Sequence, residues 1–288
     1  MRNNSASAIV LMLASAIAFA QDAVFRVDSR LVEVYATIRD RNGRYVDSLT
    51  GGQFEVRDNG EAQSLVAFES NSSRLSCAIL LDTTGSMAEA LPTVKNSVIK
   101  LMDALRDEDA VAVYAFANGM SRLQDFTSDK AAAKQAVLRT RAAGSTALFD
   151  AISEVAREIA PRSGKKAIIV FTDGKDNASV LNSKSAVDRA RKTGVPVYTI
   201  AEGEALQSKP LLDELKDISQ STSAVTFQAH KTTDISAVFQ EISKDLQHTY
   251  MLAYKPPLDT TQRWRTIQLA VPGMKDAKIR AKEGYSPE

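Results

Sequence analysis

The fold of this 288-residue chain is decided by residues 77–86, which read Cys77-Ala-Ile-Leu-Leu81 and then Asp82-Thr-Thr-Gly-Ser86. The first five residues form a continuous apolar run, as expected of a strand that is covered on both faces. The next five carry mostly oxygen-bearing side chains, and an apolar stripe with helical spacing begins at Leu91. The stretch therefore predicts a buried parallel strand that ends in a polar loop before a helix.

Strands and helices alternate from this stretch to about residue 247. Further strands are expected at 111–116, 123–126, 167–171, 195–200 and 224–227, and helical stripes at 148–159, 211–218 and 235–246, with another helix ending at Gly194. Alternation of this kind predicts a mainly parallel sheet with helices on both faces. We therefore assign residues 75–247 to one α/β domain.

The two flanks of this domain, residues 21–74 and 248–288, have residue patterns typical of β-strands and turns. Alternating apolar residues from Val32 to Ile38 predict a half-buried strand, and Asn42-Gly43 and Asn59-Gly60 predict hairpin turns. Three more strands are expected at 249–254, 264–271 and 278–282. Because neither flank alone has enough strands for a core, we predict that they pair into one small β-sandwich in which the α/β domain is inserted, with Trp264 in its core.

Composition and the amino terminus restrict the class of protein. With 36 Lys and Arg against 35 Asp and Glu, the chain has almost no net charge that would attract nucleic acid. Its single cysteine excludes an intrachain disulfide framework. Residues 1–20 combine Arg2, an apolar run and Ala-Phe-Ala before Gln21, which is typical of a signal peptide cleaved after Ala20. We expect a secreted or periplasmic chain with no membrane insertion after cleavage; an uncleaved membrane anchor is the alternative.

Candidate functional residues lie in three loops of the α/β domain. These residues are Asp82, Thr84 and Ser86 after the first strand, Thr146 before a helix, and Asp173 at the end of another strand. Functional groups of an α/β sheet gather at the carboxyl ends of its strands. Two carboxylates and three hydroxyls are hard oxygen donors that suit Mg²⁺, and they leave a coordination position for an incoming carboxylate.

With these residues in this order, the sequence resembles the von Willebrand factor type A domain family. Its metal-ion-dependent adhesion site reads Asp-x-Ser/Thr-x-Ser, followed by a distant Thr and a distant Asp, and Asp82, Thr84, Ser86, Thr146 and Asp173 match that pattern. The resemblance implies a Rossmann-like, doubly wound fold and a site for Mg²⁺ or Mn²⁺. It also implies a non-enzymatic role in adhesion, in which the metal ion binds an Asp or Glu of a protein partner.

The flanks resemble those of exported acidobacterial-type proteins of the same family. This weaker likeness rests on Val-Glu-Val at 32–34, Phe54-Glu-Val56 with Asp58-Asn-Gly60, and Glu283-Gly-Tyr285. It says little about function.

Each site residue also has an ordinary structural interpretation. Ser86 with Glu89 is the pattern of a capping box, and Thr146 is placed to cap a helix. Asp82 is placed to interact with a helix start, and Asp173-Gly174 is a common turn sequence. All of these interpretations must hold together for the metal site to disappear.

An enzyme is the alternative function. An Asp82 nucleophile followed by Thr172-Asp-Gly174 resembles the haloacid-dehalogenase-like phosphatases, with Lys165 or Lys166 as the cationic group. Against this alternative, position 84 lacks the second acid that most such phosphatases need. A third possibility is an idle metal site in a protein whose β flanks mediate assembly.

Overall fold

The computed structural model describes residues 31–70, 72–231, 234–257 and 263–287. The predicted signal peptide at residues 1–20, and residues 21–30 of the amino-terminal flank, lie outside this range. Within the described residues, no helix combines the length and apolar character that crossing a bilayer requires.

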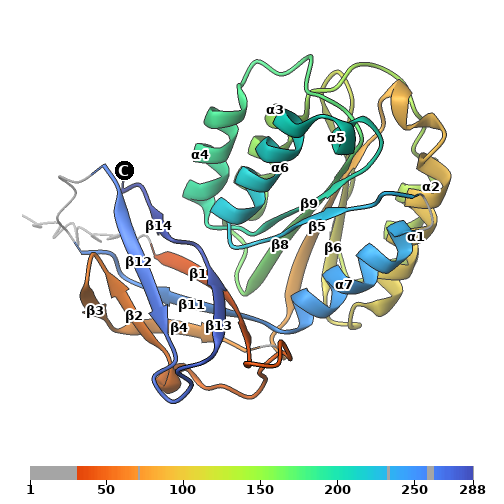
Figure 1. The fold of residues 1–288 in the computed structure, drawn as a ribbon. Coiled ribbons are helices and arrows are strands. Elements are labelled where there is room, and N and C mark those ends of the chain that lie inside the picture. Colours follow the sequence, from red (N-terminus) through yellow and green to blue (C-terminus); the bar gives the residue numbers. More distant parts are fainter. Residues whose placement is uncertain (1–30, 71, 232–233, 258–262, 288) are drawn as a thin grey trace, which may run out of the picture.

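A six-stranded sheet forms the centre of the α/β domain (Figure 1), with the strand order β10-β9-β8-β5-β6-β7. Its members are β5 (Leu75–Asp82), β6 (Ala110–Phe116), β7 (Met120–Thr127), β8 (Lys165–Thr172), β9 (Val197–Ala201) and β10 (Thr226–Gln228). All neighbouring strands pair in parallel except β7, which runs antiparallel at one edge. Every residue of β5 and β8 is buried, because helices cover both faces of the sheet.

Helices pack on the two faces in separate groups (Figure 1). On one face lie α1 (Leu91–Ala104), α2 (Lys130–Arg139) and α7 (Ile235–Gln247). On the other lie α3 (Leu148–Ile159), α4 (Ser183–Thr193), α5 (Glu204–Gln207) and α6 (Lys209–Ser221). Helix α2 was not predicted from the sequence, because its buried residues are mainly alanines that give no apolar stripe.

Two further four-stranded sheets pair the flanks with one another. One sheet has the order β13-β1-β11-β4 and the other β14-β12-β2-β3. Their members are β1 (Val32–Arg39), β2 (Glu55–Asp58), β3 (Glu61–Gln63), β4 (Leu65–Glu69), β11 (Thr249–Tyr254), β12 (Arg265–Ala270), β13 (Lys278–Ala281) and β14 (Gly284–Tyr285). One apolar cluster draws residues from both sheets. This confirms the predicted fold class, a mainly parallel α/β domain inserted in a β-sandwich.

Strand β1 differs from the half-buried strand that its alternation predicts. Tyr35 and Thr37, expected to face solvent, are only 2% and 3% exposed. The hydroxyl of Tyr35 accepts a hydrogen bond from the backbone N–H of Lys166 at 3.2 Å, so this face of the sandwich packs against the α/β domain. The prediction was wrong because it treated the sandwich as if it stood alone.

Trp264 also differs from its prediction as a core residue of the sandwich. Its side chain is 39% exposed, and Arg191 of α4 lies over the indole ring at 4.9 Å from the ring centroid. The ring lies against Gly284, where a Cβ atom would come within 2.5 Å of it. Trp264 therefore joins the edge of the sandwich to α4.

Candidate metal centre

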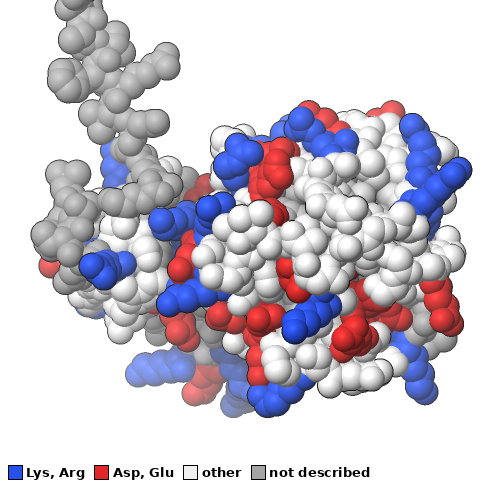
Figure 2. Space-filling model, turned by 90° about the horizontal axis from the view of Figure 1, so that it is seen from above, with Lys and Arg blue, Asp and Glu red and all other residues white. Residues whose placement is uncertain are grey.

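The predicted site residues follow β5 and β8, which are neighbours in the central sheet. The two strands pair in parallel register from Leu75 with Lys165 to Leu81 with Phe171. Their carboxyl ends therefore lie side by side, which brings Asp82 next to the residues that end β8. Figure 2 looks down on this end of the domain and shows a broad area of uncharged residues with acidic and basic groups around it.

Asp82 is fully buried at the end of β5 and held by both of its carboxylate oxygens. Oδ1 accepts a hydrogen bond from the backbone N–H of Thr84 at 2.9 Å, and Oδ2 accepts one from the hydroxyl of Thr172 at 2.7 Å. Burial raises the pKa of Asp82, and the nearby Asp173 raises it further, while the hydrogen bonds act in the opposite direction. The carboxylate is thus fixed in place at an electrostatic cost.

A chain of hydroxyl groups leads from the Asp82 loop to Asp173. The hydroxyl oxygens of Thr84 and Ser86 are 3.1 Å apart, and the Ser86 hydroxyl donates to Oδ1 of Asp173 at 3.0 Å. Ser86 lies in the short 3-10 helix η2 (Gly85–Ala88), and α1 begins only at Leu91, with Ala90 as its N-cap. The capping-box interpretation of Ser86 is therefore wrong, and its hydroxyl belongs to the carboxylate cluster.

Thr146 reaches the same cluster from the loop before α3. Its backbone N–H donates to Oδ1 of Asn177 at 2.9 Å, and its carbonyl accepts from the N–H of Asn177 at 3.0 Å. A Cβ atom on Gly174 would lie 3.5 Å from the Thr146 hydroxyl oxygen and 3.9 Å from that of Ser86. Both hydroxyls therefore face the same glycine, and the cap of α3 is Ala147, not Thr146.

The cluster is acidic, and its two aspartates have no ion pair among the residues that the structure describes. Burial raises the pKa of Asp173, and the charge of Glu204 raises it further. The pKa of Glu202 is raised too, by burial and by the charges of Asp173 and Glu89. In the described part of the chain, neither Asp82 nor Asp173 forms an ion pair with Lys, Arg or His.

The donor set fits a hard divalent cation. It consists of two carboxylates and three hydroxyls, the kind of oxygen ligand that Mg²⁺ and Mn²⁺ prefer. Across residues 31–287, gaps excepted, no group of three or more His, Cys, Asp or Glu side chains is placed to hold a metal ion. The mixed carboxylate and hydroxyl cluster is thus the metal candidate that the described residues offer.

A second layer of side chains, which the sequence analysis missed, fastens the loop after β8 to the start of α3. Oδ2 of Asp176 accepts from the backbone N–H of Phe149 at 2.9 Å. The two oxygens of Asp150 accept from the N–H groups of Val180 and Leu181 at 2.8 and 3.0 Å. These partners are 27 to 31 residues apart, so no local pattern marks them. Thr172 precedes Asp173 in the sequence, but its role as a hydrogen-bond donor depends on Asp82, which is 90 residues away.

Lys165 and Lys166 lie far from this cluster. They begin β8 and pair with the first residues of β5, so roughly 23 Å of strand separates them from Asp82. The ammonium of Lys166 donates to the carboxylate of Glu33 at 2.7 Å, and that of Lys165 to the carbonyl of Leu246 at 3.1 Å. Neither of these two lysines therefore lies beside Asp82.

Comparison with known proteins gives a consistent family. Residues 77–242 match the von Willebrand factor type A domain. A stretch of 150 residues is 29% identical to the uncharacterized protein YfbK of Escherichia coli (strain K12), and the alignment covers 48% of this chain and 26% of that protein. The chain thus spans only about a quarter of the length of that relative.

Solved structures share the fold at low sequence identity. A von Willebrand factor type A protein from Catenulispora acidiphila has a TM-score of 0.53 at 17% identity, over 90% of this chain and 74% of that one. The corresponding domain of the type V pili tip protein Mfa5 from Porphyromonas gingivalis has a TM-score of 0.51 at 13% identity, over 59% and 94% of the two chains. BatB from Bacteroides thetaiotaomicron gives 0.50 at 23% identity, over 59% and 98%. The first of these similarities includes residues of the flanks, because an alignment that covers 90% of the chain is longer than the α/β domain.

Proposed function

Because this chain belongs to the von Willebrand factor type A domain family, we propose that it is an exported binding protein that recognises a carboxylate of a protein partner through a divalent cation. Domains of this family commonly bind a divalent metal ion and mediate contacts between proteins. A pilus tip protein is among the proteins that share its fold. The proposed role is adhesive and not enzymatic.

Asp82, Thr84, Ser86, Thr146 and Asp173 would hold the cation in this proposal. A bound Mg²⁺ or Mn²⁺ would supply an electrophilic position for a carboxylate oxygen of the partner. The protein's own contribution is preorganisation. Thr172 and the N–H of Thr84 fix Asp82, and the loop after β8 is fastened to α3, so the donors need little rearrangement on binding.

The observation that supports the proposal best is the linked pair of buried carboxylates, for which the described residues provide no cationic partner. Asp82 and Asp173 are 0% and 8% exposed, and the hydroxyls of Thr84 and Ser86 lie between their loops. Two buried acids held close together destabilise a protein unless something neutralises them. A divalent cation would neutralise both.

The position of the two lysines in the phosphatase alternative also favours binding over catalysis. With Lys165 and Lys166 at the other end of β8, the arrangement offers a phosphoryl group no cationic clamp from these lysines.

The test is calorimetric and thermal titration of the full chain with Mg²⁺ and Mn²⁺. At a metal concentration 100 times the dissociation constant, binding should stabilise the fold by about 2.7 kcal/mol, which corresponds to a rise in Tm of roughly 5–10 °C. Asp82→Asn and Asp173→Ala should abolish both the heat of binding and the rise in Tm. Asp103→Ala, at an exposed acid on α1, should change neither.

Two results would contradict the proposal. One is a wild-type chain that takes up neither metal ion. The other is hydrolysis of an aryl phosphate by the wild type that is lost in Asp82→Asn, which would favour the phosphatase. Capture of a protein partner that persists in a chelator would instead assign the contact to the β flanks and leave the metal site idle.

A further inference from the structure

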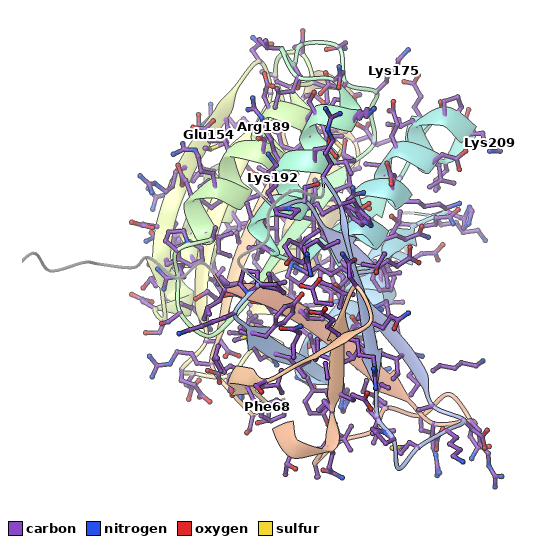
Figure 3. All side chains as sticks on the ribbon, turned by 90° about the vertical axis from the view of Figure 1, so that its left-hand side faces the viewer. Phe68, Glu154, Lys175, Arg189, Lys192 and Lys209 are labelled. Atoms are coloured by element: carbon purple, nitrogen blue, oxygen red, sulfur yellow. The ribbon has the colours of Figure 1, made fainter. Side chains whose placement is uncertain are left out.

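A cavity of about 250 Å³ lies where the carboxyl end of α4 meets the β-sandwich. Its lining combines apolar residues, among them Val32, Pro256 and Tyr285, with the charged residues Glu33, Arg191, Lys192 and Lys282. Figure 3 looks onto this side of the molecule, where Lys192 and Arg189 project from α4. The helix is 11 residues long and its amino end follows the loop after β8, so roughly 16 Å of helix separates the cavity from that loop.

Lys282 is the unusual member of this lining. It directly follows β13 and is 4% exposed. Its ammonium nitrogen lies 3.4 Å from the position that a Cβ atom on Gly194, another lining residue, would take. No hydrogen bond or ion pair joins this ammonium to any of the residues that the structure describes.

The neighbouring Lys166 shows what a satisfied buried lysine looks like here. Its ammonium donates to the carboxylate of Glu33 at 2.7 Å and to the carbonyls of Ala160 and Arg162 at 3.1 and 2.8 Å. Glu33 also accepts from the hydroxyl of Tyr35 at 3.1 Å. Glu33, whose charge acts on Lys282 and which also lines the cavity, is thus already engaged by other donors.

Burial lowers the pKa of Lys282 to about 8, with the charge of Glu33 acting in the opposite direction. At neutral pH the side chain is therefore still mostly an ammonium ion. A buried ammonium without a counter-ion is destabilising. An anion that entered the cavity would relieve this cost and raise the pKa of Lys282 again, so binding would be coupled to proton uptake.

We propose that this cavity binds a small organic anion, with a single carboxylate against the ammonium of Lys282 and an apolar body against Val32, Pro256 and Tyr285. One buried positive charge matches a monoanion. Arg191 contributes little to a second charge, because its guanidinium is paired with the carboxylate of Asp188 at 3.7 Å and also contacts Ser221 and the ring of Trp264. The mainly apolar lining favours a carboxylate on a ring or an aliphatic chain over a small hydrated ion.

The test uses benzoate as the probe and benzamide as its neutral analogue of the same shape. Calorimetry of the full chain at pH 7 should detect benzoate and not benzamide. Chelation of divalent metal should leave benzoate binding unchanged, which separates this site from the metal centre. Lys282→Met should weaken benzoate binding at least tenfold, and Lys278→Met, at an exposed lysine of β13, should leave it unchanged.

A pH series on the wild-type chain keeps the proposal falsifiable even if Lys282→Met does not fold. The affinity for benzoate should fall about tenfold per pH unit above pH 8, because the ammonium form is then depleted. Absence of benzoate binding, equal binding of benzamide, or an affinity that is constant from pH 7 to 9.5 would overturn the proposal.

Discussion

Replacing Asp58 by alanine should unfold the β-sandwich far more easily, because this one carboxylate joins strands from both of its sheets. Asp58 is fully buried at the end of β2. It accepts from Nε of Arg265 on β12 at 2.6 Å and from the hydroxyls of Tyr254 on β11 and Tyr285 on β14 at 2.9 and 2.8 Å. All three partners belong to the carboxyl-terminal flank, whereas Asp58 belongs to the amino-terminal one.

The expected loss follows from what the variant leaves behind. Removing one partner of a buried ion pair costs about 3–5 kcal/mol, because the remaining charge loses that stabilising interaction. Two tyrosine hydroxyls also lose an acceptor, but these losses do not add in full, since the three groups share one site. We therefore expect Asp58→Ala to lower the free energy of unfolding of the sandwich by about 4 kcal/mol.

The fluorescence of Trp264, the only tryptophan in the chain, reports on the sandwich during urea unfolding. With a urea dependence of about 2 kcal/mol per molar, the midpoint for Asp58→Ala should fall by roughly 2 M. Glu55→Ala removes an exposed ion pair with Arg57 on the same strand and should change stability by less than about 0.5 kcal/mol. A midpoint for Asp58→Ala that stays within the range of that control would refute the idea that Asp58 connects the two flanks.

Three further changes test other parts of the structure. Deleting residues 249–288 should unfold the amino-terminal flank, because β1 loses both of its neighbours; protection of residues 31–70 from protease in the truncated chain would contradict this. Lys282→Met should raise the free energy of unfolding at pH 7 by at most about 3 kcal/mol, since the pKa of Lys282 falls from 10.5 to about 8 on folding. The gain in unfolding free energy from Lys282→Met should be constant below pH 8 and disappear by about pH 10.5, because the unfolded wild type then loses its proton too. A gain that is the same at pH 7 and 10.5 would be inconsistent with a buried charge. Gly284→Ala should cost about 1–3 kcal/mol in thermal unfolding, because its Cβ would come within 2.3 Å of the Arg265 carbonyl, whereas Gly273→Ala meets no atom within 4 Å and should be neutral.

The sequence predicted those parts of the fold that depend on local pattern. Continuous apolar runs identified β5 and β8 as central strands, and Gly194, with φ of 70°, ends α4 as its position predicted. Asn59-Gly60 forms the expected turn between β2 and β3, with positive φ at both residues. In each case a neighbouring residue or a regular spacing carries the information.

Features that depend on distant contacts were not predictable in this way. Burial of Tyr35 depends on Lys166, which is 131 residues away, and the exposure of Trp264 depends on how α4 meets the sandwich. At the candidate metal centre, the sequence motif selected five residues that the structure brings together, and their binding of a metal ion stays a prediction. The motif did not show that Thr172 holds Asp82 or that Asn177 holds Thr146, because those hydrogen bonds join separate loops.

The way in which the chain enters and leaves the α/β domain has a mechanical consequence. The chain departs after Glu69 of β4, which pairs with Met251 of β11, and it returns through α7, which a single residue separates from β11. A pulling force applied at the far end of the α/β domain would be divided between the two segments that connect this domain to the sandwich. These segments join adjacent, hydrogen-bonded strands. The force would enter the sandwich at the neighbouring strands β4 and β11, and both flanks would share it, since each flank contributes one of these strands.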